Sequence, residues 1–145
     1  MTIKEQDKDI VIPSSLIYEE IDGEPIPYAG YEEVLNGTKT LEEIMGSSSL
    51  QAKIIRLLLK FLYRTVDGDG YEVYTNESGL HVEKGSNFAG DILIYESKRL
   101  ENYDFKDSYF DIPPKIIIEI DTKADVKDIL GDGYLARKTR KLHEW

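Results

Sequence analysis

The sequence predicts an α/β fold in which a mixed β-sheet is flanked by a long N-terminal helix and a C-terminal helix. Three observations support this fold class: a helical repeat of apolar residues over 49–66, several short β-branched runs between 71 and 121, and a basic helical pattern over about 134–145. The chain has 145 residues, the size of one ordinary domain, so we expect residues 1–145 to form a single domain.

The first predicted elements are short. Residues 16–21 alternate weakly between apolar and polar side chains, which predicts an edge strand within a turn-rich stretch over 10–39. Thr40 followed by Glu43 is typical of a capping box, so we expect a short helix over 41–45 that ends at Gly46.

The strongest local pattern lies over residues 49–66. After the serines at 47–49, apolar residues recur at helical spacing, namely Leu50, Ile54, Ile55, Leu58, Leu59, Phe61, Leu62 and Val66. This pattern predicts a long amphipathic helix that packs on the core. The run Asp-Gly-Asp-Gly at 67–70 ends the helix.

Short strands are predicted next, at 71–75, 79–83 and 91–95, with turns at 76–78 and 84–87 between them. A polar loop over about 97–112 carries aromatic residues. Pro113 and Pro114 then precede KIIIEID (115–121), a nearly continuous β-branched run that is typical of a strand covered on both faces.

The composition excludes several classes of protein. Cysteine is absent, which excludes disulfides and thiolate metal sites. No apolar run reaches the roughly 18 residues that span a bilayer, and residues 1–10 lack the apolar core of a signal peptide. We therefore expect a cytoplasmic protein without membrane contacts.

The formal net charge of −10 argues against a general nucleic-acid coat protein, because phosphate binding requires Lys and Arg. It also counts against DNA as a substrate. A nuclease, however, needs basic residues along one cleft only, and here they concentrate late in the chain, at Arg137, Lys138, Arg140 and Lys141.

Two carboxylates occupy unusual positions, since Asp91 opens the apolar run DILIY and Glu119 lies inside IIIEI. A carboxylate among β-branched residues is costly unless it is paired or binds a cation. Strand alternation places Glu119, Asp121 and Lys123 on one face. Mg²⁺ takes such oxygen ligands, but each acid taken singly also fits a strand-end carboxylate that faces solvent or forms a salt bridge.

From Leu16 to Trp145 the chain resembles the Uma2 family, a branch of the PD-(D/E)xK restriction-endonuclease-like superfamily. The resemblance rests on the segments YEEIDGEPI, SSSLQAKIIRLLLKFL, NFAGDILIY and PPKIIIEIDT, together with Lys138 followed by Leu142. It implies a restriction-endonuclease-like core. It also implies that Asp91 and Glu119 bind metal and that Lys138 is the catalytic lysine.

The chain departs from the family pattern at three places: Gly90 replaces a Pro, Gln51 stands where many members have a His, and Thr122 replaces a Ser. Asp121-Thr122-Lys123 also reads as D-x-K. Two registers therefore remain open. In the first register, Glu119 is the metal ligand and Lys138 is the catalytic lysine. In the second register, Asp121 is the metal ligand and Lys123 is the catalytic lysine.

Family members continue past the C-terminal helix with a Gly-Val turn and two further strands, whereas this chain stops at Trp145. We therefore expect the domain to lack its last strands, and either to expose a sheet edge or to form a homodimer.

The resemblance implies a Mg²⁺- or Mn²⁺-dependent endonuclease that hydrolyses phosphodiester bonds of DNA. Two alternatives stay open: a catalytically inactive module that retains the nuclease fold for binding or assembly, and a metal-dependent hydrolase of a nucleotide or other small phosphate. Zinc is not expected, because neither His81 nor His143 has a His or Cys partner at metal-ligand spacing.

Overall fold

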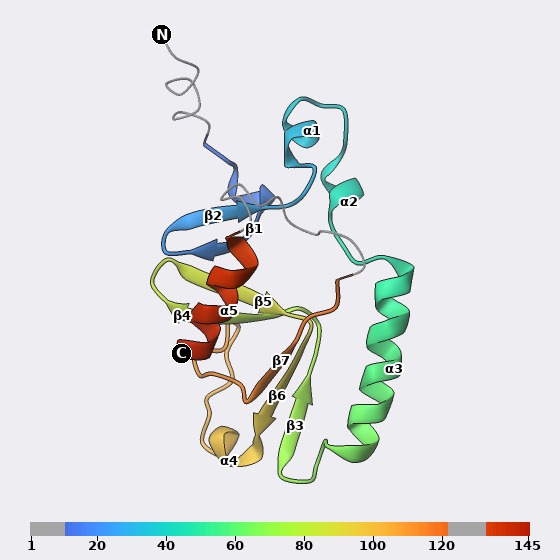
Figure 1. Cartoon of the computed structure of the whole chain (residues 1–145), viewed down its shortest axis with the longest axis vertical. Helices are drawn as coiled ribbons and strands as arrows, with labels where there is room; N and C mark the ends of the chain where they lie inside the picture. The colour runs from blue at the N-terminus through green and yellow to red at the C-terminus, as the bar shows by residue number, and fades with distance from the viewer. Residues whose placement is uncertain (1–10, 122–132) are drawn as a thin grey trace.

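The computed structural model describes residues 11–121 and 133–145. Its elements form an α/β arrangement (Figure 1). In chain order they are β1 (Ile17–Ile21), β2 (Glu24–Pro27), α1 (Tyr31–Leu35), α2 (Leu41–Ile44), α3 (Ser49–Thr65), β3 (Tyr71–Tyr74), β4 (Ser78–Glu83), β5 (Ser86–Gly90), β6 (Ile92–Glu96), α4 (Ser97–Leu100), β7 (Ile116–Ile118) and α5 (Tyr134–Glu144). A 3₁₀ turn over Ser14–Leu16 precedes β1.

The strands form two antiparallel sheets, with the orders β2-β1-β5-β4 and β3-β6-β7. The α/β class is as predicted, but the single mixed sheet is not, because every ladder between the described strands is antiparallel. For two of the pairings the connections require this, because short turns join β1 to β2 and β4 to β5, whereas parallel neighbours need a crossover of a dozen or more residues.

One long hairpin contributes to both sheets: its β4 and β5 part belongs to the first sheet, and its β3 and β6 part belongs to the second. Residues 71–83 run antiparallel to 86–96, and the turn between them includes Gly85, whose φ of +84° suits glycine. The hairpin is interrupted where residues 75–77 face Asp91 and Ile92. Asn76 and Glu77 both have positive φ there, at +77° and +48°. Three residues opposite two make a bulge, which bends the hairpin and divides it between the two sheets.

Several local predictions need correction. β1 pairs with β2 on one side and β5 on the other, so it is not an edge strand. Residues 86–90, within and beyond the predicted turn at 84–87, form β5. The Thr40 side chain makes no capping hydrogen bond to α2 in the described part of the chain, so the capping box does not form.

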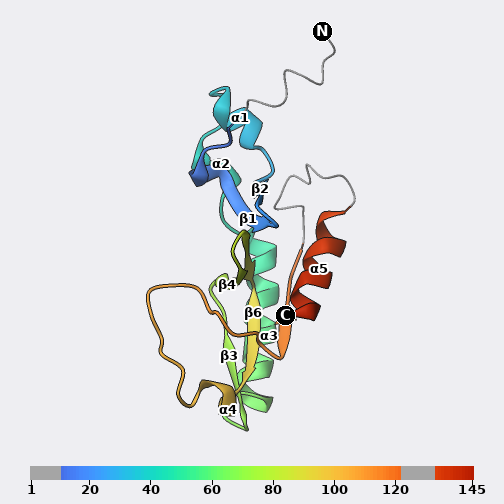
Figure 2. The same cartoon turned by 90° about the vertical axis from the view of Figure 1, so that its left-hand side faces the viewer.

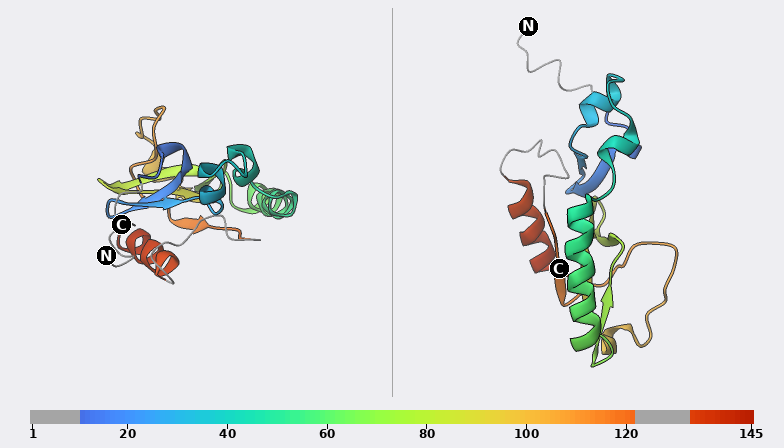
Figure 3. Two further views of the ribbon diagram at one scale, coloured as in Figure 1. Left: turned by 90° about the horizontal axis from the view of Figure 1, so that it is seen from above. Right: turned by 90° about the vertical axis from the view of Figure 1, so that its right-hand side faces the viewer.

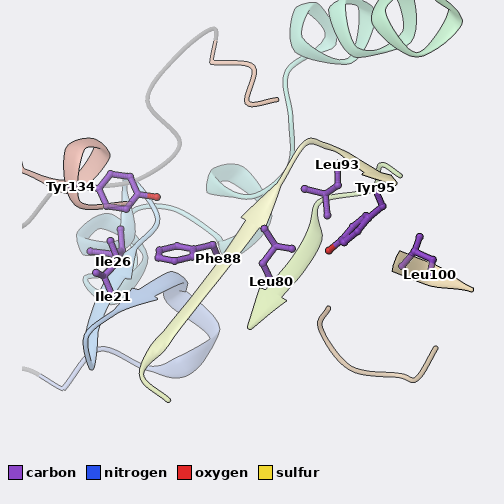
Figure 4. Packing of buried hydrophobic residues seen from close by; sticks show 8 residues of the cluster. All are labelled: Ile21, Ile26, Leu80, Phe88, Leu93, Tyr95, Leu100 and Tyr134. Atoms are coloured by element: carbon purple, nitrogen blue, oxygen red, sulfur yellow. The ribbon is translucent and has the colours of Figure 1, made fainter. Parts of the chain in front are cut away.

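Strand β6 links two hydrophobic clusters because its side chains alternate between faces. Leu93 and Tyr95 belong to the first cluster, which includes Phe88 of β5 and Tyr134 of α5 (Figure 4). On the other face, Ile92 and Ile94 pack with Leu62 and neighbouring apolar residues of α3 in the second cluster. Most of the apolar residues predicted to pack on the core do so, but Leu50 and Phe61 are exposed on α3.

Helix α5 and the long loop after α4 extend from opposite sides of the strands (Figures 2 and 3). Aromatic rings of the loop, including Tyr103 and Phe110, pack against the first cluster. None of the helices in the described ranges is long and apolar enough to cross a membrane.

Candidate active site

Asp91 lies at the bend of the long hairpin, between β5 and β6. Its side chain is buried, and its Oδ2 accepts a hydrogen bond of 2.7 Å from the backbone N–H of Ile120. The Thr75 hydroxyl donates to the Asp91 carbonyl oxygen at 3.0 Å. The bulge therefore holds this carboxylate against the segment that follows β7.

Glu119 belongs to that segment. β7 ends at Ile118, so the prediction that Glu119 and Asp121 project from one face of a strand over 115–121 is wrong. The backbone around Glu119 is instead held by Asp91 and by Gln51 of α3, whose Nε2 donates to the Ile120 carbonyl at 2.6 Å. The Glu119 side chain is 30 % exposed.

Lys138 reaches this segment from α5. Its ammonium is buried and lies 3.1 Å from Glu119 Oε1 and 2.8 Å from Glu19 Oε2. It also donates to the Ala89 carbonyl at 3.3 Å. Lys138 lies 19 positions after Glu119 in the sequence, and the fold brings the two side chains into contact.

Glu19 was not predicted as a site residue. It is buried on β1, where its Oε2 accepts the Ala89 N–H at 2.7 Å and its Oε1 accepts the hydroxyl of Tyr134. The sequence contained a signal for it, because Ile17, Glu19 and Ile21 share one face of a strand whose apolar members face the core.

The other register, Asp121 with Lys123, lies only partly within the described residues. Asp121 is exposed, and its negative charge contributes to raising the pKa of Glu19. Lys123 lies outside the described residues. Of the predicted residues, Asp91, Glu119 and Lys138 are therefore the ones that the described structure links through direct contacts and electrostatic interaction.

The acids perturb one another. Burial is the largest cause that raises the pKa of the Glu119 carboxyl to about 7; Lys138 opposes it, and the charges of Asp91 and Glu19 add to it. Burial likewise raises the pKa of Glu19. For Lys138 burial works in the lowering direction, but the two carboxylates hold its pKa above the ordinary value.

Two further cations of α5, Arg137 and Lys141, form ion pairs within the protein, whereas Arg140 is exposed and has no ion pair within the described residues. Lys141 lies 2.6 Å from Asp22 and 2.5 Å from Glu83, and Arg137 lies 3.5 Å from Asp22. These ion pairs fix α5 to the β1–β2 turn and to β4. They also weaken the prediction that this helix supplies a basic cleft for a phosphate backbone.

Two hollows open beside the site. One of about 420 Å³ lies between the β7 segment and α5, and its lining includes Glu119, Lys138 and His143. The other, of about 280 Å³, is lined by Asp91 together with residues of the hairpin bulge and the start of α3. Asp91 and Glu119 thus open toward different hollows.

The side chains of the site offer few ligands for a metal ion. Within residues 11–121 and 133–145, no group of three or more His, Asp or Glu side chains could hold a metal ion. Asp91 and Glu119 each have one oxygen engaged by the protein, Oδ2 with Ile120 and Oε1 with Lys138. Each carboxylate thus keeps one oxygen for a cation such as Mg²⁺, which takes oxygen ligands and keeps several waters.

Comparison with models of protein families, with curated proteins and with solved structures gave no match for this chain.

Proposed function

We propose that this protein is a Mg²⁺- or Mn²⁺-dependent endonuclease with a restriction-endonuclease-like core that hydrolyses phosphodiester bonds of DNA. One observation carries the proposal: Lys138, Glu119 and Glu19 are in direct contact, and the charge of Asp91 adds to the perturbed pKa of Glu119. Perturbed acids beside a lysine are typical of catalytic sites.

In this proposal Asp91 and Glu119 hold the metal ion through the oxygens that the protein leaves open. The ion would supply a water of lowered pKa and would neutralise charge on the phosphate. The chain's own contribution is positioning, since the Ile120 N–H orients Asp91 and the Lys138 ammonium orients Glu119. Lys138 would also donate a hydrogen bond to a phosphate oxygen or to the attacking water.

Glu19 and Tyr134 support the lysine. Glu19 accepts hydrogen bonds from Lys138, Ala89 and Tyr134, which fixes the ammonium on one side and leaves its contact with Glu119 on the other. Both are positioning residues in this proposal, because they act through Lys138.

The test is cleavage of supercoiled plasmid and of labelled single- and double-stranded oligonucleotides with Mg²⁺ or Mn²⁺. We expect Asp91→Asn, Glu119→Gln and Lys138→Met to lower the cleavage rate by at least a hundredfold while circular dichroism stays unchanged. The matched control is Asp107→Asn, an exposed loop acid that should cleave at the wild-type rate. Equal cleavage by the wild type and the three site variants would refute the proposal.

A second function has its own supporting observation. The triad Glu19–Lys138–Glu119 is a complete ion network without a metal, and Asp91 opens toward a different hollow from Glu119. This favours a catalytically inactive module in which the network stabilises the docking of α5. Calorimetric titration with Mg²⁺ and Mn²⁺ separates the two functions. Millimolar binding that Asp91→Asn abolishes supports the nuclease, and no binding supports the module.

A further inference from the structure

Helix α3 differs from the rest of this acidic protein in its charge. It contains four basic residues and no acidic residue, whereas the whole chain has a net charge of −10. The basic residues are Lys53, Arg56, Lys60 and Arg64. None of them forms an ion pair with any other residue of the described ranges. The cations of α5, in contrast, are largely paired with acids.

The same helix also exposes large apolar side chains. Leu50, Leu57 and Phe61 are 59 %, 50 % and 62 % exposed, although the helix already buries the adjacent face against the β3-β6-β7 sheet. Figure 1 shows α3 along one border of the molecule, with its outer side facing away from the sheets. Exposed apolar residues gathered on one helix face indicate an interaction surface.

The apolar and basic residues form two adjacent stripes. The exposed Leu50, Leu57 and Phe61 follow the spacing of a coiled-coil seam, and the position between Leu50 and Leu57 is filled by Ile54, which is half-buried and also packs against the cluster beneath α3. Lys53 and Lys60 each precede a seam residue by one position, which places both on one flank of that seam. The seam is about 16 Å long, at 1.5 Å of rise per residue.

We propose that the outer face of α3 docks an acidic amphipathic helix of a partner protein. The apolar face of that helix would pack on the seam, and its acidic side chains would pair with Lys53 and Lys60. Charges flanking a coiled-coil seam choose the partner, and here they require carboxylates. This interaction does not depend on the proposed nuclease activity, because the polar partners of Asp91, Glu119 and Lys138 within the described residues do not include the seam residues.

Other occupants fit the surface less well. In a second copy placed antiparallel, Lys53 and Lys60 would face the same lysines of its partner and repel them. A phosphate backbone would satisfy the basic flank but would leave the exposed Leu and Phe side chains in water. An anionic bilayer would repel a chain of net charge −10, and the seam is narrower than the apolar face of an interfacial helix.

The test uses the full chain and a fluorescently labelled probe peptide of three heptads, with Leu at the seam positions and Glu at the flanks. A second peptide with Lys at the flanks is the matched probe. By fluorescence anisotropy we expect the Glu peptide to bind at least tenfold more tightly than the Lys peptide, and binding to weaken as salt is raised. Phe61→Ala should weaken binding at least fivefold.

Charge reversal gives the sharpest result. Lys53→Glu combined with Lys60→Glu should invert the preference, so that the Lys peptide binds better than the Glu peptide. Lys39→Glu combined with Lys98→Glu makes the same change of charge at exposed sites elsewhere and should keep the wild-type preference. Three results would each overturn the proposal: no discrimination between the peptides, tighter binding of anionic vesicles or duplex DNA through the same residues, or self-association that Phe61→Ala abolishes.

Discussion

Glu119 is a side chain whose titration should influence this protein near neutral pH. Its folded pKa is about 7, raised first by burial, whereas an unfolded Glu titrates at about 4.3. The folded protein therefore binds the proton more tightly. The resulting stability is fully present below the unfolded pKa and is lost as the pH rises through the folded pKa.

Glu119→Gln should remove this loss, because the amide stays neutral at every pH. As the pH rises from 4.5 to 8, the free energy of unfolding of the variant should increase by on the order of 1 kcal/mol relative to that of the wild type. Solvent screening of the partly exposed side chain keeps this difference small. Urea unfolding at both pH values measures it. Glu101→Gln, on the exposed surface, should show no such gain. A gain toward acid pH would contradict the burial of Glu119.

Lys138 is the second residue with a clear expected effect. Lys138→Met would leave Glu19 buried without its ammonium, and losing one partner of a buried ion pair costs about 3–5 kcal/mol. We expect the lower end of that range, because Ala89 and Tyr134 still donate to Glu19. Combining Lys138→Met with Glu19→Gln should recover part of the loss in a double-mutant cycle.

Lys141→Met is the control on the same helix. Its ion pairs with Asp22 and Glu83 are nearer the surface, so its removal should cost less than about 1 kcal/mol. If both lysine variants lose the same stability, Lys138 is not the buried ion-pair partner described above.

At the scale of elements, the start of α3 offers a direct test. Ser48 is the N-cap residue, and its side chain accepts the backbone N–H of Gln51 at 3.1 Å. Ser48→Ala should lower the free energy of unfolding by about 1 kcal/mol. Ser47→Ala, next to the cap and exposed, should change it by less than about 0.5 kcal/mol. Equal effects from both serines would place the cap elsewhere.

The elements also show which sequence patterns were informative. The helical repeat predicted α3 within one residue at each end, because apolar periodicity and a serine cap agree there. Residues 86–90 were partly read as a turn, because Ser, Asn and Gly favour turns locally. Pairing with β1 and β4 decides their conformation instead, and no local pattern contains that information.

Some residues of the candidate site could likewise be predicted from the sequence, and others could not. Asp91 and Glu119 were found because each is an acid within an apolar run, and Lys138 was found through the family-like segment. The alternation that placed Asp121 beside Glu119 failed, because β7 stops at Ile118. Glu19 contacts Lys138 across 119 positions of sequence, and this contact follows only from the docking of α5 on β1.

The whole molecule depends on β6, which contributes side chains to both hydrophobic clusters. Ile94 is 4 % exposed in the cluster beneath α3, while Leu93 and Tyr95 lie in the cluster that Trp145 also packs against. Since one strand serves both clusters, loosening one should loosen the other. We therefore expect the described sheets and helices to unfold as one cooperative unit.

Ile94→Ala tests this cooperativity. Removing buried methyl groups beneath α3 should lower the free energy of unfolding by about 3 kcal/mol. Trp145, the single tryptophan, reports on the other cluster, and far-ultraviolet circular dichroism reports mainly on the helices. Both signals should shift to the same lower urea midpoint in the variant, because β6 cannot leave one cluster and keep its place in the other. An unchanged Trp145 transition beside an earlier loss of helix would mean that α3 and its sheet unfold separately. The bend at Asp91 would then divide the molecule into two cooperative units.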